Sequence, residues 1–135
     1  MGAKVSKAVA TATAEALKST SARERHGAVV LRNRKIIGLG YNDSRPLGYL
    51  RQNRIRQFCN EQSHAETAAM HNVSRADLLG SVVVVIRLSR SGELTYSRPC
   101  STCMEAMARK GIRKCYYSVD EESFGVITFP WRRRG

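Results

Sequence analysis

The chain has 135 residues, of which 42% are hydrophobic and 25% are charged, as is ordinary for a globular protein. This length predicts a single domain over residues 1–135, with a basic tail at 130–135. Lys and Arg outnumber Asp and Glu by 23 to 11, so the net charge is +12 and the pI is about 10.2. Such an excess predicts an anionic partner, either a nucleotide phosphate or a nucleic acid.

The sequence predicts no membrane span, because its longest apolar run extends only from Val82 to Ile86. Residues 1–20 lack the apolar core of a secretory signal. We therefore expect an intracellular protein that is not secreted and is cytoplasmic, with the nucleus left open. In a reducing compartment the four cysteines favour metal binding over disulfides.

The first half of the chain predicts one helix, a hairpin and a long loop. The helix extends from Lys4 to Lys18. Its apolar face comprises Val5, Ala8, Val9, Ala12, Ala16 and Leu17. Strands over Gly27–Leu31 and Lys35–Tyr41 flank a polar turn at 32–34, a pattern typical of a hairpin. Residues 42–62 predict a long surface loop.

The second half predicts an alternation of helices and strands, over Ser63–His71, Val82–Ile86, Cys100–Lys110, Ile112–Val119 and Phe124–Phe129. The uninterrupted β-branched run that begins at Val82 indicates a central strand covered on both faces. Gly111 ends the last helix. The link between the last two strands is too short for a helical crossover, so these strands should pair antiparallel. The predicted fold class is α/β, with a mixed sheet flanked by helices.

Two short clusters predict a metal site. His64 begins one predicted helix, and Cys100 and Cys103 lie on one turn of another, so that both sulfurs can reach one ion. Three protein ligands with an open fourth position are typical of catalytic zinc, one Zn²⁺ per chain. A helix N-terminus also lowers the pKa of a thiol and keeps it deprotonated. Glu66 lies two residues from His64 and can take a proton from a water molecule beside the metal.

Other interpretations of these clusters stay open. Ser63 and Glu66 fit a helix capping box, which would explain the carboxylate without chemistry. A structural zinc site would need a fourth protein ligand, for which Cys59 is the strongest candidate. The other spare ligands are His26, His71 and Cys115, of which Cys115 is expected in the core.

The ordered pair His64-Ala65-Glu66 and Pro99-Cys100-Ser101-Thr102-Cys103 resembles the signature of the zinc-dependent cytidine and deoxycytidylate deaminase superfamily. The likeness extends to three further segments, Gly27-Ala28-Val29-Val30, Gly40-Tyr41-Asn42 and Gly111–Tyr117. It implies a three-layer α/β/α fold with a mixed five-stranded sheet, and a dimer or tetramer.

By the same resemblance, His64, Cys100 and Cys103 bind zinc and Glu66 is the proton shuttle. The resemblance also implies that Ala28, Asn42 and the backbone of Ala65 help to hold the substrate. The short link into the last strand is similar to the free cytidine and blasticidin deaminase branch.

The expected substrate is a cytosine nucleotide or nucleoside, deaminated by hydrolysis to the uracil product and ammonia. Four arginines in the predicted loop could grip a phosphate in two-point fashion and favour CMP or dCMP over a nucleoside. They are Arg45, Arg51, Arg54 and Arg56. The alternative is that they belong to a solvated loop.

In a second interpretation the same positive charge binds a nucleic acid, and the protein deaminates cytosine or adenine in single-stranded DNA or RNA. An aromatic side chain in the tail could stack on an unpaired base beside three arginines. These residues are Trp131, Arg132, Arg133 and Arg134. A third is a catalytically idle nucleic-acid-binding module with structural zinc, against which Glu66 argues.

Overall fold

The computed structural model describes residues 3–21, 24–43, 58–59, 62–71 and 73–130. Its helices are α1 (Ala3–Ala16), α3 (Ala65–His71), α4 (Arg75–Leu78) and α5 (Ser101–Arg109). Its strands are β1 (Arg25–Arg32), β2 (Lys35–Tyr41), β3 (Phe58–Cys59), β4 (Gln62–Ser63), β5 (Val82–Leu88), β6 (Leu94–Thr95), β7 (Lys114–Ser118) and β8 (Phe124–Thr128). In this part of the chain no helix is long and apolar enough to cross a membrane.

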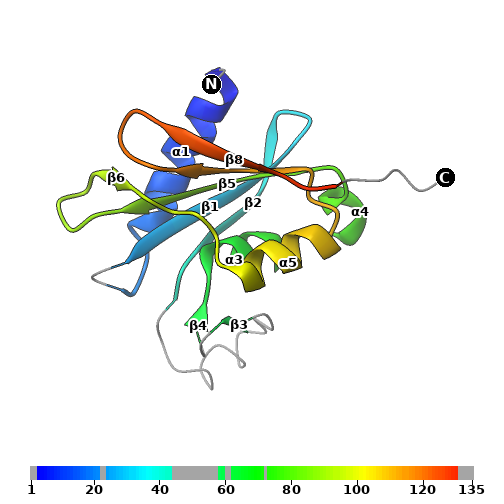
Figure 1. Ribbon diagram of the computed structural model, residues 1–135, viewed down its shortest axis with the longest axis horizontal. Coiled ribbons are helices and arrows are strands. Elements are labelled where there is room, and N and C mark those ends of the chain that lie inside the picture. Colours follow the sequence, from blue (N-terminus) through cyan, green and yellow to red (C-terminus); the bar gives the residue numbers. More distant parts are fainter. Residues whose placement is uncertain (1–2, 22–23, 44–57, 60–61, 72, 131–135) are drawn as a thin grey trace.

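The centre of the fold is a mixed sheet in the order β2-β1-β5-β7-β8 (Figure 1). Only β5 and β7 run parallel, and the other neighbours are antiparallel. The predicted antiparallel pairing of the last two strands is confirmed, with Tyr116 opposite Val126. The resemblance implied five strands, and the described sheet has a sixth, because the two-residue strand β6 pairs with the end of β5.

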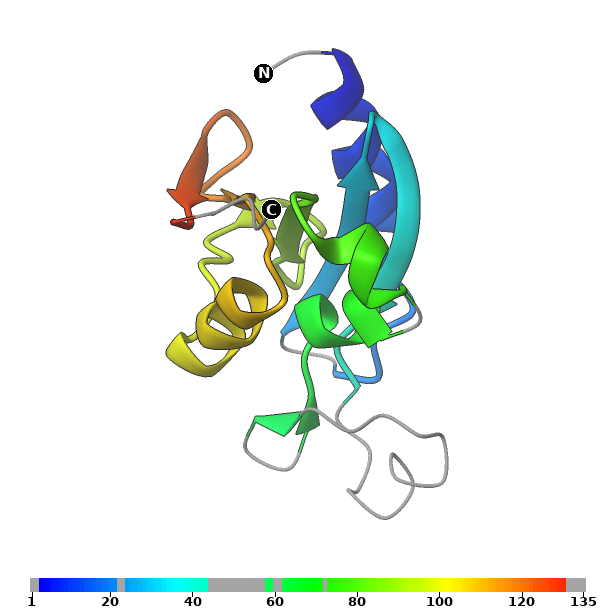
Figure 2. The same ribbon diagram turned by 90° about the vertical axis from the view of Figure 1, so that its right-hand side faces the viewer.

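Helices cover both faces of the sheet and confirm the expected three layers (Figure 2). On one face α1 buries Ala8, Ala12 and Ala16, which recur every four residues and share one side of the helix. Their small side chains let the helix approach β1 so closely that a Cβ on Gly27 would clash with the backbone oxygen of Ala12. Leu17, predicted on this face, is 62% exposed because α1 ends one residue before it.

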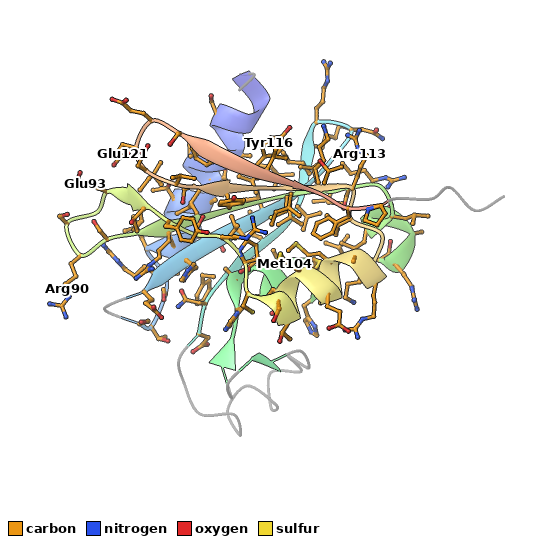
Figure 3. All side chains as sticks on the ribbon, in the orientation of Figure 1. Arg90, Glu93, Met104, Arg113, Tyr116 and Glu121 are labelled. Atoms are coloured by element: carbon orange, nitrogen blue, oxygen red, sulfur yellow. The ribbon has the colours of Figure 1, made fainter. Side chains whose placement is uncertain are left out.

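On the opposite face α3 and α5 pack on a second core. Ala65, Met70 and Met107 are among its fully buried side chains, and Met104 packs against it. Met104 and Tyr116 belong to the cores on opposite faces of the sheet (Figure 3). The run from Val83 to Ile86 is completely buried, and its side chains alternate between the two cores, as expected for a central strand.

The hairpin of β1 and β2 is also confirmed, although its loop is shorter than predicted. Arg32 pairs with Lys35, so only Asn33 and Arg34 form the loop, both with positive φ (48° and 70°). Positive φ at both residues of a two-residue loop matches the right-handed twist of the two strands that the loop connects.

Four short described elements were missed by the sequence prediction, namely β3, β4, α4 and β6. Residues 75–78 lie outside the predicted elements but form α4, whose N-cap Ser74 accepts a hydrogen bond from the backbone N–H of Asp77. Ser63 pairs with β3 rather than beginning the helix, and α3 starts at Ala65. Four-residue helices and two-residue strands are too short to produce a recognisable hydrophobic period.

Candidate metal centre and pocket

The metal-binding residues lie where two helices begin on the same side of the sheet. The carbonyl of His64 accepts a hydrogen bond from the backbone N–H of Ala68, so His64 is the N-cap of α3. Cys100 is the N-cap of α5, and its carbonyl accepts from Met104 in the same way. Cys103 follows in the first turn of α5 and is 1% exposed. The helix starts therefore bring His64 together with Cys100 and Cys103, which follow it by 36 and 39 residues in the sequence.

The distances within this cluster suit a zinc ion. His64 Nδ1 lies 3.8 Å from the sulfur of Cys100 and 3.2 Å from that of Cys103, and all three ligand atoms lie within 4.8 Å of one another. Tetrahedral zinc with ordinary Zn–N and Zn–S bond lengths places such atoms about 3.6 Å apart. One imidazole nitrogen and two sulfurs thus form a donor set that fits zinc without rearrangement of the backbone. Pro99 precedes the N-cap rather than occupying the first helical position.

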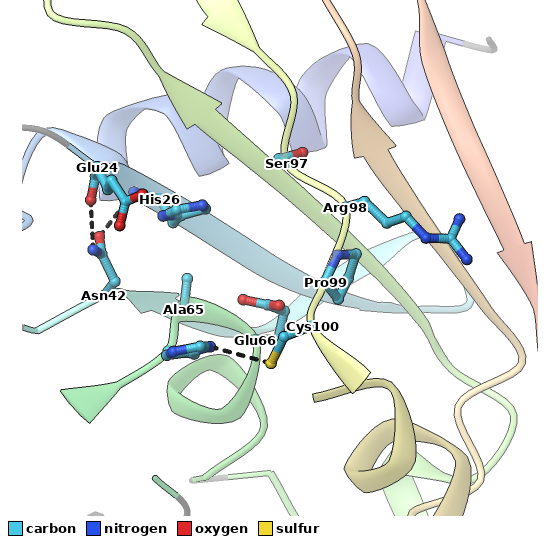
Figure 4. A pocket seen from close by; sticks show the side chains of 10 residues that line it. Glu24, His26, Asn42, Ala65, Glu66, Ser97, Arg98, Pro99 and Cys100 are labelled. Carbon is cyan, nitrogen blue, oxygen red and sulfur yellow. Dashed lines mark hydrogen bonds between the residues drawn. The ribbon is translucent and has the colours of Figure 1, made fainter. Parts of the chain in front are cut away.

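Glu66 lies in the same pocket and is only 4% exposed (Figure 4). Burial raises the pKa of its carboxyl group, and this effect is opposed by its own backbone N–H, by His64 and by the thiol of Cys103. The capping-box interpretation is wrong, because α3 begins at Ala65 and Ser63 therefore does not occupy the N-cap. The interactions with His64 and Cys103 place the carboxyl group beside the metal cluster.

The spare ligands do not join this cluster among the described side chains. Cys115 is fully buried in the core, as predicted, and burial raises the pKa of its thiol. His71 is exposed at the end of α3, whereas His26 lines the pocket. The side chain of Cys59 is outside the described part of the structure.

The pocket has a volume of about 180 Å³ and opens at the edge of the sheet. This is smaller than the roughly 300–1,000 Å³ of pockets that enclose drug-sized ligands. Its walls come from the start of β1, the end of β2 and the starts of α3 and α5 (Figure 4). The lining residues are Glu24, His26, Asn42, His64, Ala65, Glu66, Ser97, Arg98, Pro99 and Cys100.

Two of the three residues expected at the substrate by resemblance line this pocket. Ala65 lies at the start of α3, and Asn42 follows the last residue of β2. The side-chain oxygen of Asn42 accepts a hydrogen bond from the backbone N–H of His26 (2.8 Å), and its amide group donates to the carbonyl of Glu24. Ala28 is not brought to the pocket, because its side chain is fully buried in the core beneath α3.

His26 is a pocket residue that the sequence interpretation considered only as a spare metal ligand. Burial, together with the charges of Arg87 and His64, lowers its pKa to about 4, and Glu24 opposes the shift. Arg87 lies directly opposite His26 on the neighbouring strand β5. The ring of His26 is therefore neutral at pH 7. Its place could have been inferred from strand alternation, since His26 shares a face with the buried residues Ala28 and Val30.

Arg98 was also missed, although it directly precedes the Pro99-Cys100 pair. It is exposed, donates a hydrogen bond to the hydroxyl of Tyr117 and lies over the ring of Tyr117 at 5.6 Å. Figure 4 shows its guanidinium directed away from Glu66. The predicted phosphate-binding residues Arg45, Arg51, Arg54 and Arg56 lie outside the described residues, and so do Trp131, Arg132, Arg133 and Arg134.

Comparison with solved structures shows what this architecture is similar to. A dCMP deaminase of the cyanophage S-TIM5 in apo form is 23% identical, with a TM-score of 0.62 over 87% of this chain and 84% of that chain. A cytidine deaminase of Burkholderia pseudomallei is 16% identical, with a TM-score of 0.64 over 95% of this chain and 93% of that chain. At these identities the likeness shows a cytidine-deaminase-like fold. No curated protein matches the sequence.

The sequence itself matches a family model, the cytidine and deoxycytidylate deaminase zinc-binding region, over residues 3–119. The matched segment contains the histidine and both cysteines of the metal cluster. Zinc is therefore the metal that this cluster binds. The chain belongs to the cytidine and deoxycytidylate deaminase family.

Proposed function

We propose that this protein hydrolyses the exocyclic amino group of a free cytosine nucleoside or nucleotide, giving the uracil product and ammonia. The observation that supports the reaction most directly is the buried carboxyl group of Glu66 in one pocket with the metal cluster. The choice of cytosine is supported by the family and by the related cyanophage dCMP deaminase, which was also solved in complex with dCMP and dUMP.

In the proposed reaction, water adds to C4 of the base, the bond from C4 to the amino nitrogen breaks, and ammonia leaves. When zinc is bound, it supplies a Lewis acid that lets water act as a nucleophile near neutral pH. The carboxylate of Glu66 accepts a proton from the attacking water and donates it to N3 of the ring. Glu66 then takes the remaining proton of that water from the new hydroxyl on C4 and transfers it to the departing amino group. A buried carboxyl group with a raised pKa suits this double role, because it holds a proton more readily than an exposed one.

The dimensions of the pocket support a small substrate. A volume of about 180 Å³ suits a pyrimidine ring with the adjoining part of its sugar, and the phosphate of a nucleotide would extend past the pocket mouth. We assign contacts with the substrate to Ala65 and Asn42, both of which line the pocket. The four arginines of residues 45–56 remain our candidates for a phosphate contact, because the net charge of +12 favours an anionic substrate.

The test is a direct assay of uracil formation by the zinc-loaded full chain at two salt concentrations. The substrates are cytidine, deoxycytidine, CMP, dCMP, a single-stranded DNA and a small RNA. We expect turnover of the monomers with only a mild salt effect, and none by the Glu66→Ala variant. Turnover of the polymers alone, falling steeply with salt, would overturn the monomer assignment, since phosphate contacts along a polymer release many counterions. Absence of any product that depends on Glu66 would overturn the cytosine assignment.

A further inference from the structure

One end of the pocket lies away from the metal and is lined by side chains without a role in the proton transfers. In Figure 4 His26, Glu24 and Asn42 lie together at this end, separated from Cys100 by Glu66 and Ala65. His26 belongs to β1, Glu24 directly precedes this strand, and Asn42 directly follows β2. This wall is therefore formed at the ends of two strands, whereas the metal-binding residues lie at the starts of two helices.

The chemistry of cytosine determines which part of the substrate faces this wall. The amino-bearing C4 must lie beside the metal cluster and Glu66 for the reaction to occur. The sugar is attached to N1, which lies directly across the six-membered ring from C4. With C4 at the helix starts, the sugar is directed toward the opposite end of the pocket, where His26 lies.

The backbone of His26 is held in place by two hydrogen bonds to Asn42. Its N–H donates to the side-chain oxygen of Asn42 at 2.8 Å, and its carbonyl accepts from the backbone N–H of Asn42 at 3.3 Å. Both His26 atoms belong to the strand β1, which pairs on both edges with β2 and β5. Because the backbone is restrained, little ordering of the main chain is needed when the side chain binds a ligand.

The protonation of His26 limits what it can bind. Burial and the guanidinium of Arg87 keep the imidazole neutral, with a pKa of about 4, so it offers one N–H and one unprotonated nitrogen. In either tautomer the unprotonated nitrogen is an acceptor. A phosphate oxygen cannot pair with it, because phosphate oxygens are acceptors as well. The complementary group on a nucleoside is therefore a hydroxyl, which can donate.

We propose that His26 is a specificity-determining residue that accepts a hydrogen bond from the 2′- or 3′-hydroxyl group of the substrate's sugar. The inference rests on the proposed function, because the orientation of the base depends on the attack at C4. The consequence is a preference for nucleosides over free cytosine and over analogues that lack the sugar hydroxyls. His26 thereby selects the sugar, while Glu66 and the metal cluster act on the base.

The experiment compares kcat/KM for cytidine, deoxycytidine, 3′-deoxycytidine and 2′,3′-dideoxycytidine, using zinc-loaded wild type and three variants. His26→Phe removes the acceptor but keeps a planar ring, and His26→Gln restores a hydrogen-bonding group. His71→Gln is the matched control, because His71 is an exposed histidine outside the pocket. Zinc content and unfolding by urea are measured on each variant to establish that it is folded and loaded.

Wild type is expected to prefer the best hydroxyl-bearing nucleoside over dideoxycytidine by about tenfold or more, since a hydrogen bond is lost without it. His26→Phe should reduce this ratio to near one, His26→Gln should recover part of it, and His71→Gln should leave it unchanged. An equal loss on all four nucleosides, or an unchanged ratio in His26→Phe, would overturn the inference while the deaminase assignment stands. Failure of wild type to act on any of the four, and on CMP and dCMP as well, would overturn both.

Discussion

Replacing Gly40 with alanine should displace the helix that carries the metal site. A Cβ at position 40 would lie against the backbone N of Ala69 and 2.5 Å from the backbone oxygen of Ala65. An ordinary contact begins at 3.4 Å, so β2 and α3 must separate by about 1 Å. Neither atom belongs to a side chain that can rotate away. We therefore expect a loss at the upper end of the range for overpacking, about 3 kcal/mol in the free energy of unfolding.

The same displacement should weaken zinc binding, because His64 is at the start of α3 while both cysteines are at the start of α5. Misplacing one ligand by about 1 Å should lower the zinc affinity by 10- to 100-fold. Urea unfolding measures the stability, and competition with a chelator measures the affinity. Gly92→Ala is the control: its φ of +86° disfavours alanine, but no atom lies within 4 Å of the new Cβ.

The control separates the effect of an unfavourable backbone conformation from the effect of a close contact between β2 and α3. Gly92→Ala should cost about 1–2 kcal/mol, the usual penalty for a left-handed residue, and should leave the zinc affinity unchanged. If Gly40→Ala costs no more than the control and binds zinc as wild type does, the close packing of β2 on α3 does not position the metal site.

Two further predictions concern the cysteines and His26. Cys103→Ser should lower the zinc affinity by more than about 100-fold in a chelator competition, whereas Cys115→Ser should retain one zinc per chain and lose about 1–3 kcal/mol of stability. Equal zinc retention by both variants would contradict the assignment of the ligands. His26 has a folded pKa of about 4, below the 6.5 of the unfolded chain, so the unfolded chain takes up the proton first as the pH falls. The free energy of unfolding should therefore fall as the pH is lowered from 6.5 toward 4. At pH 4.5 wild type should have lost about 2–3 kcal/mol more than His26→Gln has. Parallel stability curves of wild type and His26→Gln between pH 7.5 and 4.5 would contradict this result.

The metal cluster could be predicted from the sequence because its determinants are local. Two cysteines three residues apart on a helix share a face in any fold, and a proline before them indicates where the helix begins. The pairing of the last two strands was equally accessible, since only four residues separate the predicted strands that end at Val119 and begin at Phe124, too few for a helical crossover. These predictions depend on spacing within one or two elements.

The wall at the sugar end of the pocket could not be predicted in the same way. His26 reaches it through the register of β1 against β5, which places it opposite Arg87 and beside Asn42 from the end of β2. The neutral state of its ring depends on burial by segments far away in the sequence. Ala28 shares the strand but lies two residues deeper, where α3 covers it. A motif cannot reveal how far a helix extends over a strand.

The central claim, hydrolytic deamination by zinc and Glu66, is tested most directly by running the reaction in ¹⁸O-labelled water. Zinc-loaded wild type and Glu66→Gln are compared with deoxycytidine and dCMP, and the zinc content of both proteins is measured. Wild type should place one ¹⁸O on C4 of the uracil product and release one ammonia for each uracil formed. Glu66→Gln should hold the same zinc and react about 10²–10⁴-fold more slowly. Uracil formation by Glu66→Gln at the wild-type rate, or a uracil product without ¹⁸O, would contradict the account.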